Sequence, residues 1–527
     1  MRSDLYMTAT EYFARKSSGL ARSVSARDAL IYNLMFMVPV GTWIYGIWAL
    51  ILFPGADLPT TVLVSEVVAL IVGTFYTLFS ASMPRSGGDY IWTSRILHPS
   101  IGFAMNFFLA VVFTFIGGST MFWVTQYSLG PMFQVLGMND IAQFLLSSGG
   151  TFVVAVILYI LFGVLITRGA KLTHVILAVL FVFTLAAIVT YNVTLLSVGT
   201  SGFKANFNAV SGMNYDQVIT AGEAAGYPSS YVMGSTILAV AFTYLSFVGF
   251  NATVFYSAEI KDVRKSQFIA ILGATVLYMF ILYINYFDTV SIMGPQFVGS
   301  MAYLFGTGNA AYTLSFPPFF QNLFRFATVG NPLAFSIVAI GFSATSAAGV
   351  LTYVFGSTRM VFAWAFDRVV PMSLAKVDSR YRSPYMAIIA VTVASIIGMV
   401  LWVYTSLLTF FLYATFGWMV MQGFTSVAGI VFPWRRKDIF DSSPEIVKRK
   451  VAGVPMITLF GIATLICTLY IGYASVAPAY QGTFNPSYMS FVIGIILVGA
   501  VLYFISWAYR KKTGLPLELT FKNIPPE

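Results

Sequence analysis

Two short segments of this chain place helix-breaking residues inside long apolar runs, and both can expose peptide groups for binding. They are residues 38–42, which read VPVGT, and residues 246–250, which read SFVGF. An unwound backbone in a bilayer has no water to pair with, so such a break persists only where it lines a cavity or binds a ligand. The predicted chemistry is noncovalent recognition of a polar solute by peptide groups. The alternative is a proline kink and a packing glycine, both frequent in membrane helices.

The breaks belong to apolar runs that are long enough to cross a membrane. A spanning helix needs about 20 apolar residues, and the sequence supplies twelve such runs. The breaks fall in the first and the sixth run, and the third and the eighth are unusually long. The expected spans are 29–53, 58–82, 100–129, 144–167, 171–198, 232–258, 266–293, 333–365, 385–404, 407–431, 454–473 and 489–508.

Spans 1 to 5 and spans 6 to 10 thus share a broken first member and an overlong third member, which indicates an inverted repeat of five helices. Because five is odd, the two halves insert with opposite orientations. Paired breaks in corresponding helices point to a transporter's substrate site. We expect an all-α polytopic membrane protein with twelve transmembrane helices, discontinuous helices 1 and 6, and two extra C-terminal helices.

These spans divide the chain into seven parts. The expected parts are a cytoplasmic N-terminal tail (1–28), the first five-helix repeat (29–198), an extracellular loop (199–231), the second, inverted repeat (232–431), a cytoplasmic loop (432–453), helices 11 and 12 (454–508) and a cytoplasmic C-terminal tail (509–527). The external connections 199–231 and 294–332 contain glycine, asparagine, proline and aromatic residues. They are either partly ordered caps over an external vestibule or passive loops.

Composition excludes a soluble globular protein. Hydrophobic residues make up 58% of the chain and charged residues 9%, with a mean hydropathy of +0.82. The single cysteine, Cys467, lies inside an apolar run, which excludes a disulfide framework. The two histidines, His98 and His174, are far apart and do not suggest a metal cluster. We therefore expect no catalytic residues, no cofactor and no enzymatic activity. A sodium site is the one metal site that the sequence leaves as a possibility.

The positive charge marks the expected cytoplasmic side. The net charge of +10 would suggest nucleic acid in a soluble protein, but here its distribution decides its meaning. Except for Lys204 and Arg325, the lysines and arginines fall in tails, in cytoplasmic connections or, for Lys171 and Arg359, in the cytoplasmic part of a span, as the positive-inside rule requires. The basic clusters then face anionic lipid headgroups. We expect a plasma-membrane protein with both termini in the cytoplasm and no nucleic-acid partner; the oligomeric state stays open.

Three passages carry a family resemblance. Residues 83–103 read MPRSGGDYIWTSRILHPSIGF, in which Asp89 can accept from Arg85 or Arg95. This passage closely resembles the Pro-Arg-Ser-Gly-Gly-Glu/Asp-Tyr signature of the amino acid-polyamine-organocation permeases. Residues 247–266 and 357–388 resemble further conserved passages of that family, at the end of helix 6 and after helix 8. The resemblance implies twelve helices and a leucine-transporter-like fold.

The resemblance also implies a substrate site at the two breaks. Amides of unwound helix 1 (Gly41, Thr42, Trp43) would hold a carboxylate, and carbonyls of helices 1 and 6 (Pro39, Leu245, Val248) would hold an ammonium group. Phe242 and Tyr244 lie near the position of the family's aromatic gate. The expected substrate-binding residues are Pro39, Val40, Gly41, Thr42, Trp43, Phe242, Tyr244, Leu245, Ser246, Val248, Gly249 and Asn251.

Two positions depart from the family pattern. The indole of Trp43 stands where small residues usually permit close backbone approach. Asn251 replaces an acidic residue that is frequent in the family, which makes a cationic substrate less favoured.

The coupling ion has several candidate residues. Ser343, Thr345 and Ser346 in helix 8 resemble the hydroxyl groups of a sodium site, and Thr184 stands where some proton-coupled relatives carry a lysine. Membrane hydroxyls also bond their own backbone or a neighbouring helix. Glu66, inside helix 2, is a candidate proton carrier or a neutral acid bonded to a neighbouring helix. Sodium and protons both remain open.

The sequence therefore predicts a secondary active transporter that moves a small, neutral amino acid or related amine by alternating access. An amine or polyamine exchanger of the same fold and a sensor that does not transport are alternatives. A facilitator built as six plus six helices would need a long basic loop after helix 6, and the connection 260–265 is short. A membrane enzyme would need a convergent catalytic cluster, which the sequence does not supply.

Overall fold

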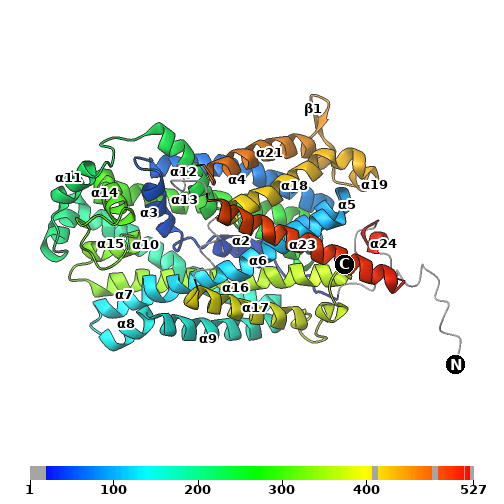
Figure 1. The fold of residues 1–527 in the computed structure, drawn as a ribbon, viewed down its shortest axis with the longest axis horizontal. Helices are drawn as coiled ribbons and strands as arrows, with labels where there is room; N and C mark the ends of the chain where they lie inside the picture. The colour runs from blue at the N-terminus through cyan, green and yellow to red at the C-terminus, as the bar shows by residue number, and fades with distance from the viewer. Residues whose placement is uncertain (1–18, 406–412, 478–484, 515–516, 523–527) are drawn as a thin grey trace.

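The computed structural model describes residues 19–405, 413–477, 485–514 and 517–522 (Figure 1). The start of the expected N-terminal tail (1–18), part of the tenth span (406–412), the connection 478–484 and parts of the C-terminal tail (515–516 and 523–527) lie outside the described residues. The described residues are almost entirely helical, with one short hairpin of β1 (Lys450–Val451) and β2 (Val454–Pro455).

Ten of the described helices are long and apolar enough to cross a membrane. They are α4 (Leu58–Ser82), α6 (Pro99–Val124), α9 (Ser148–Thr167), α10 (Ala170–Val210), α13 (Val263–Met293), α16 (Pro332–Phe366), α17 (Tyr385–Tyr404), α18 (Ala414–Arg435), α21 (Met456–Ala474) and α23 (Pro486–Lys512). Many of their apolar side chains are exposed, including Ile157, Val182 and Leu469. Such an exposed apolar surface suits contact with lipid.

The first and the sixth expected span are each broken into two pieces. The first consists of α2 (Ala26–Phe36) and α3 (Trp43–Leu52), and the sixth of α12 (Met233–Ser246) and the 3₁₀ helix η2 (Ala252–Glu259). The helices α2 and η2 contact each other, and so do α3 and α12. The two breaks that the sequence predicts are therefore present and lie in paired elements.

Two spans run further than their apolar composition predicts. The third span, expected to end at residue 129, passes through the π-helical turn η1 (Thr125–Leu129) into α7 (Gly130–Val135). The fifth, expected to end at residue 198, bends at Gly199, where φ is +65°, and continues to Val210. A positive φ suits glycine, and the backbone at Gly199 is non-helical, so the regular helix stops next to its expected end and a second helical segment follows.

The remaining helices gather at two opposite ends of the bundle (Figure 1). We call one the cap end, because α11 (Tyr215–Ala224), α14 (Pro295–Gly306) and α15 (Phe320–Ala327) lie there, with α8 (Asn139–Leu146) nearby. The other is the basic end. It holds α5 (Asp89–Ile96), η3 (Met372–Ala375), α19 (Lys437–Asp441), α20 (Glu445–Lys448) and α24 (Leu517–Lys522). The long external connections of the sequence thus form helical caps and are not passive loops.

Two buried ion pairs tie the basic end together. Arg359 of α16 pairs with Glu259 at the end of η2 at 2.8 Å, and Arg95 of α5 pairs with Asp367 at 2.7 Å. The guanidinium of Arg359 also stacks on Phe355, 3.7 Å from the ring centre. Because all four charged side chains are at most 2% exposed, each of them depends on its ion-pair partner to offset the loss of hydration.

The expected partners of Asp89 were wrong. Its Oδ1 accepts hydrogen bonds from Tyr76 at 2.6 Å and from Thr425 at 2.8 Å, whereas Arg95 turns to Asp367. The signature carboxylate thus joins α5 to α4 and α18 through neutral donors. Burial raises the pKa of Asp89 to about 6, although both hydrogen bonds lower it.

The buried Asp89 predicts a pH dependence of stability. Its folded-state pKa lies above the unfolded value, so the folded chain loses up to about 3 kcal/mol from this group as pH rises from about 4 to about 6. We expect the melting temperature of wild type relative to Asp89→Asn to fall across that range. Melting curves of the purified protein between pH 4 and pH 7.5 measure this, and a pH-independent difference would contradict it.

The Arg359–Glu259 pair predicts a double-mutant result. Arg359→Met alone leaves an unpaired buried carboxylate and should destabilise the protein by about 3–5 kcal/mol. The double variant Arg359→Met/Glu259→Met removes both charges and should recover most of that loss. Chemical or thermal unfolding in detergent compares the two. Equal destabilisation in the single and the double variant would show that the pair has no mutual dependence.

Candidate substrate-binding site

The break between α2 and α3 contains a strained residue. Val38 has a φ of +50°, a conformation that a β-branched residue rarely adopts and that costs on the order of 1–3 kcal/mol. The side chain fills a notch in α16, because a methyl group added at Gly349 would lie 2.6 Å from Cγ2 of Val38. A methyl at Gly41 would likewise lie 2.6 Å from Cγ1 of Val38 and 2.8 Å from the Trp123 ring. Close contacts on both sides thus hold this turn in place.

The break after α12 requires glycine for two reasons. Gly249 has a φ of +111°, and a methyl group in place of its α-hydrogen would overlap the ring of Phe36. Phe36 is the last residue of α2, so the second break lies directly against the end of the helix that precedes the first. The structure brings the two breaks together, as expected from the sequence.

The peptide groups of the breaks are partly engaged in this conformation. The amide of Thr42 donates to the carbonyl of Val38 at 3.1 Å, and that of Trp43 donates to Val40 at 3.2 Å. The carbonyl of Leu245 accepts from Val248 at 3.2 Å. The bond from Trp43 is a tight i→i−3 contact, and the turn is therefore closed on itself.

Two tyrosines of α13 add a polar contact that sequence reasoning missed. The hydroxyl groups of Thr42 and Tyr278 lie 2.7 Å apart, and the hydroxyl of Tyr286 donates to the carbonyl of Thr42 at 3.4 Å. The hydroxyl of Ser246, at the end of α12, is buried near both tyrosines and has no hydrogen-bond partner of ordinary geometry among the described residues. The spacing of eight residues places these tyrosines on one face of one helix, and this spacing was a signal available in the sequence.

Aromatic side chains cover the breaks from the cap end. The ring of Tyr45 lies 5.7 Å from Trp123 and 5.5 Å from Phe242. Trp43 is fully buried, 4.3 Å from the ring of Tyr191, and its indole nitrogen is among the described buried groups without a hydrogen-bond partner. Phe242 thus lies in an aromatic cluster with Tyr45 and Trp123, two residues that sequence reasoning missed.

A second aromatic layer covers the breaks from the basic end. The ring of Phe36 lies 5.0 Å from Phe113 and 4.7 Å from Tyr353, centre to centre. Beyond it, Tyr32 and Tyr256 are 4.7 Å apart. Aromatic rings thus cover the breaks from both ends of the bundle.

The other expected substrate-binding residues take varied positions. Tyr244 lies apart from the aromatic cluster and interacts with Gln422 and Cys467. Val40 and Asn251 are buried, and Leu245 and Val248 are half-buried. The hydroxyl of Thr42 also approaches the carbonyl of Pro39 at 3.4 Å.

The expected sodium ligands differ in their bonding. Ser343 donates to Val124 at 3.3 Å, and Ser346 donates to Phe342 of its own helix at 2.8 Å. The hydroxyl of Thr345 is buried and has no hydrogen-bond partner among the described residues. Thr345 lies one helical turn from Gly349, which contacts Val38, so its face of α16 points toward the first break.

Glu66 is a buried acid in α4 and is 5% exposed. Neither of its carboxyl oxygens has a hydrogen-bond partner of ordinary geometry within the described chain. Thr275 on α13 approaches the carboxyl group, but its hydroxyl donates to the carbonyl of Leu272 at 2.9 Å. An ionised carboxylate without donors is strongly disfavoured in such surroundings, so the neutral acid is the favoured form.

The chain is similar to known transport proteins along most of its length. Residues 28–501 match the family model described as amino acid permease. A methylthioribose transporter of Bacillus subtilis is 23% identical over 525 residues, covering 95% of this chain and 96% of its own length. The branched-chain amino acid permease BcaP of B. subtilis is 24% identical over 70% of this chain and 72% of its own length.

BcaP of Lactococcus lactis subsp. cremoris is 23% identical over 62% of this chain and 65% of its own length. The match of the family model includes both breaks, the signature around Asp89 and all ten long helices through the first part of α23. The family resemblance of the three sequence passages is thus confirmed. The chain belongs to the amino acid permease family.

Proposed function

We propose that this protein is a secondary active transporter that binds a small neutral amino acid, or a related amine, between its two helix breaks. The contact of Gly249 with Phe36 carries this proposal, because it brings both sets of unwound peptide groups to one place. Paired breaks of this kind supply positive helix N-termini to an anionic group and carbonyls to a cationic group. A zwitterion presents both groups.

The surroundings of the breaks favour an uncharged, apolar substrate side chain. Trp43, Tyr45, Trp123 and Phe242 enclose the cap-end side with ring faces. Asn251 stands in the place of a family carboxylate and cannot neutralise a cationic side chain. The branched-chain amino acid permeases among the relatives support an aliphatic amino acid, and the methylthioribose transporter makes a thioether-bearing solute the second candidate.

The two aromatic layers support alternating access as the mechanism of this proposed transporter. Separation of Tyr45 and Phe242 from Trp123 would open the site to the cap end, and separation of Phe36 from Phe113 and Tyr353 would open it to the basic end. We assign the cap end to the outside and the basic end to the cytoplasm of the plasma membrane, since Lys204 and Arg325 are the two basic residues of the expected external segments. In this proposal the first two helices of each repeat, within 29–198 and 232–431, rock against the rest of the bundle.

A methyl group at the second break tests the site. Gly249→Ala should reduce leucine uptake at least about tenfold, since the added carbon overlaps Phe36 and the φ of +111° disfavours alanine. Gly234→Ala, within α12, is the matched control, because a methyl group at this position has no contact within 4 Å. Uptake by reconstituted proteoliposomes, normalised to incorporated protein, is the measurement.

Unchanged leucine uptake in Gly249→Ala would refute the site. If the wild-type protein binds leucine but shows neither net uptake nor counterflow, the result would favour a sensor that does not transport. Counterflow that depends on internal amine, without net uptake, would favour the exchanger.

We propose protons as the coupling ion, carried by Glu66. Because the carboxyl group is buried without donors, Glu66→Gln should retain substrate binding and lose the stimulation of uptake by external acid. Uptake measured with an imposed pH gradient, with and without sodium, checks this expectation. Sodium-dependent uptake that disappears in Thr345→Ala, with no effect of pH, would instead assign coupling to the helix 8 hydroxyl groups.

A further inference from the structure

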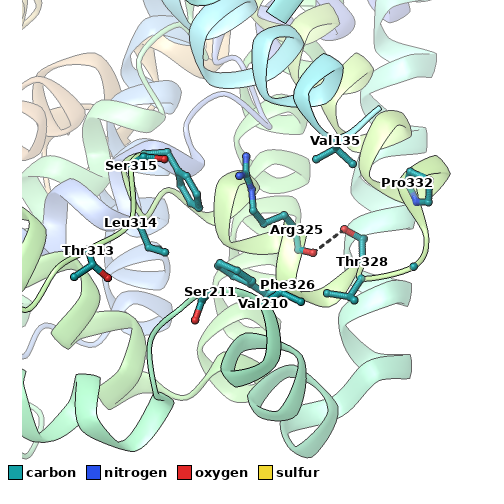
Figure 2. A pocket seen from close by; sticks show the side chains of 13 residues that line it. Val135, Val210, Ser211, Thr313, Leu314, Ser315, Arg325, Phe326, Thr328 and Pro332 are labelled. Carbon is teal, nitrogen blue, oxygen red and sulfur yellow. Dashed lines mark hydrogen bonds between the residues drawn. The ribbon is translucent and has the colours of Figure 1, made fainter. Parts of the chain in front are cut away.

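A pocket of about 490 Å³ lies at the cap end, apart from the two helix breaks (Figure 2). Its wall is formed by α15, the connection that precedes it, the C-terminal end of α10 and the last residue of α7. Arg325 of α15 extends along this wall, between the side chains of Ser315 and Val135 in the view of Figure 2. The volume is in the range of small-molecule sites.

Two nitrogen donors of the Arg325 guanidinium lack hydrogen-bond partners. Its Nε and Nη2 atoms are buried, and neither has a hydrogen-bond partner in the described part of the chain. The salt bridges of the described residues do not include Arg325. A buried donor without an acceptor is costly, and a cationic donor more so.

The residues around Arg325 hold its guanidinium group in place and leave its N–H donors available. Its guanidinium lies 4.0 Å from the ring centre of Phe316, so one face is covered by an aromatic ring. Burial lowers the pKa of Arg325 to about 10, which still leaves the group charged at neutral pH. The hydroxyl-bearing residues of the lining are Ser211, Thr313, Ser315 and Thr328.

A neighbouring residue shows the same lack of partners. Gln321 lies one turn before Arg325 on the same face of α15, and it is only 4% exposed. Neither its amide oxygen nor its amide nitrogen has a hydrogen-bond partner among the described residues. Two adjacent polar groups on one helix face are therefore unsatisfied, although the helix is otherwise well packed against α10 and α3.

The other cation at this end behaves differently. Lys204 of α10 is solvent-exposed and pairs with Asp216 at 2.7 Å. It needs no additional anion. Positive charge at the cap end is therefore available as an unpaired donor at Arg325 and not at Lys204.

We infer that the Arg325 pocket is a binding site for a small anion, with the carboxylate group as its preferred ligand. A carboxylate would accept from Nε and Nη2 of the planar guanidinium side by side, which is the geometry that favours arginine over lysine. The aromatic ring of Phe316 and the hydroxyl groups would surround the remainder of the ligand. This inference concerns binding at the cap end and does not rest on the proposed transport function.

Ligand-dependent melting of the purified full-length protein tests the site. Sodium acetate supplies a carboxylate, sodium chloride an inorganic anion, and acetamide a neutral molecule of the same shape as acetate. At low ionic strength we expect acetate to raise the melting temperature saturably by about 2 °C in wild type and in the control Lys204→Met. The rise should disappear in Arg325→Met and weaken in Arg325→Lys, which keeps the charge but not the fork of donors.

A second variant covers the case in which Arg325→Met does not fold. Ser315→Trp leaves the guanidinium intact and places a large side chain in the lining of the pocket, so it should also abolish the acetate effect. An effect of acetate alone supports the carboxylate, and equal effects of acetate and chloride assign the same site to inorganic anions. Equal stabilisation by acetamide, or an acetate effect that persists in Arg325→Met and Ser315→Trp, would overturn the inference.

Discussion

A peptide group inside a membrane must be paired, and the architecture of this permease depends on where that requirement is relaxed. Helical bonding ends at Phe36 and again at Ser246, and both interruptions persist because neighbouring side chains fix them. Phe36 covers Gly249, Gly349 accommodates Val38, and Tyr278 pairs with Thr42. These contacts come from three different helices. The surrounding bundle is thus a support for two short stretches of non-helical chain.

The two ends of the bundle cover the helix breaks by different means. At the cap end, aromatic rings and the short helix α15 cover the breaks, and Phe320 of α15 reaches the ring of Tyr286. At the basic end, the cover consists of rings backed by the ion pairs of Arg359 and Arg95. Each ring contact is weak and has more than one favourable arrangement, whereas an ion pair in a dry interior demands a defined geometry and costs more to separate.

The sequence predicted the spans and the breaks because both are set by local composition. Apolar run length locates a membrane helix, and proline or glycine within a run locates its interruption, so α4 and α17 match the expected spans 58–82 and 385–404 at both ends. What the sequence could not predict depends on helix rotation. The partners of Asp89 come from α4 and α18, and Tyr244 faces Gln422 rather than the breaks. No local pattern specifies which faces of distant helices meet, and the family pattern placed Tyr244 at the gate without that information. Tyr278 and Arg325 were likewise visible as residues, but their roles required the positions of their neighbours.

The Arg359–Glu259 pair disfavours a partial separation of the elements that it joins at the basic end. While the interface is closed, each charge is stabilised by the other; once the interface parts widely enough to admit water, each is stabilised by hydration. A partial separation, too wide for the hydrogen bonds and too narrow for a hydration shell, has neither. Intermediate separations of the two charges are therefore strongly disfavoured, and under the proposed alternating access the basic end would pass between a dry and a wet state without a stable half-open form.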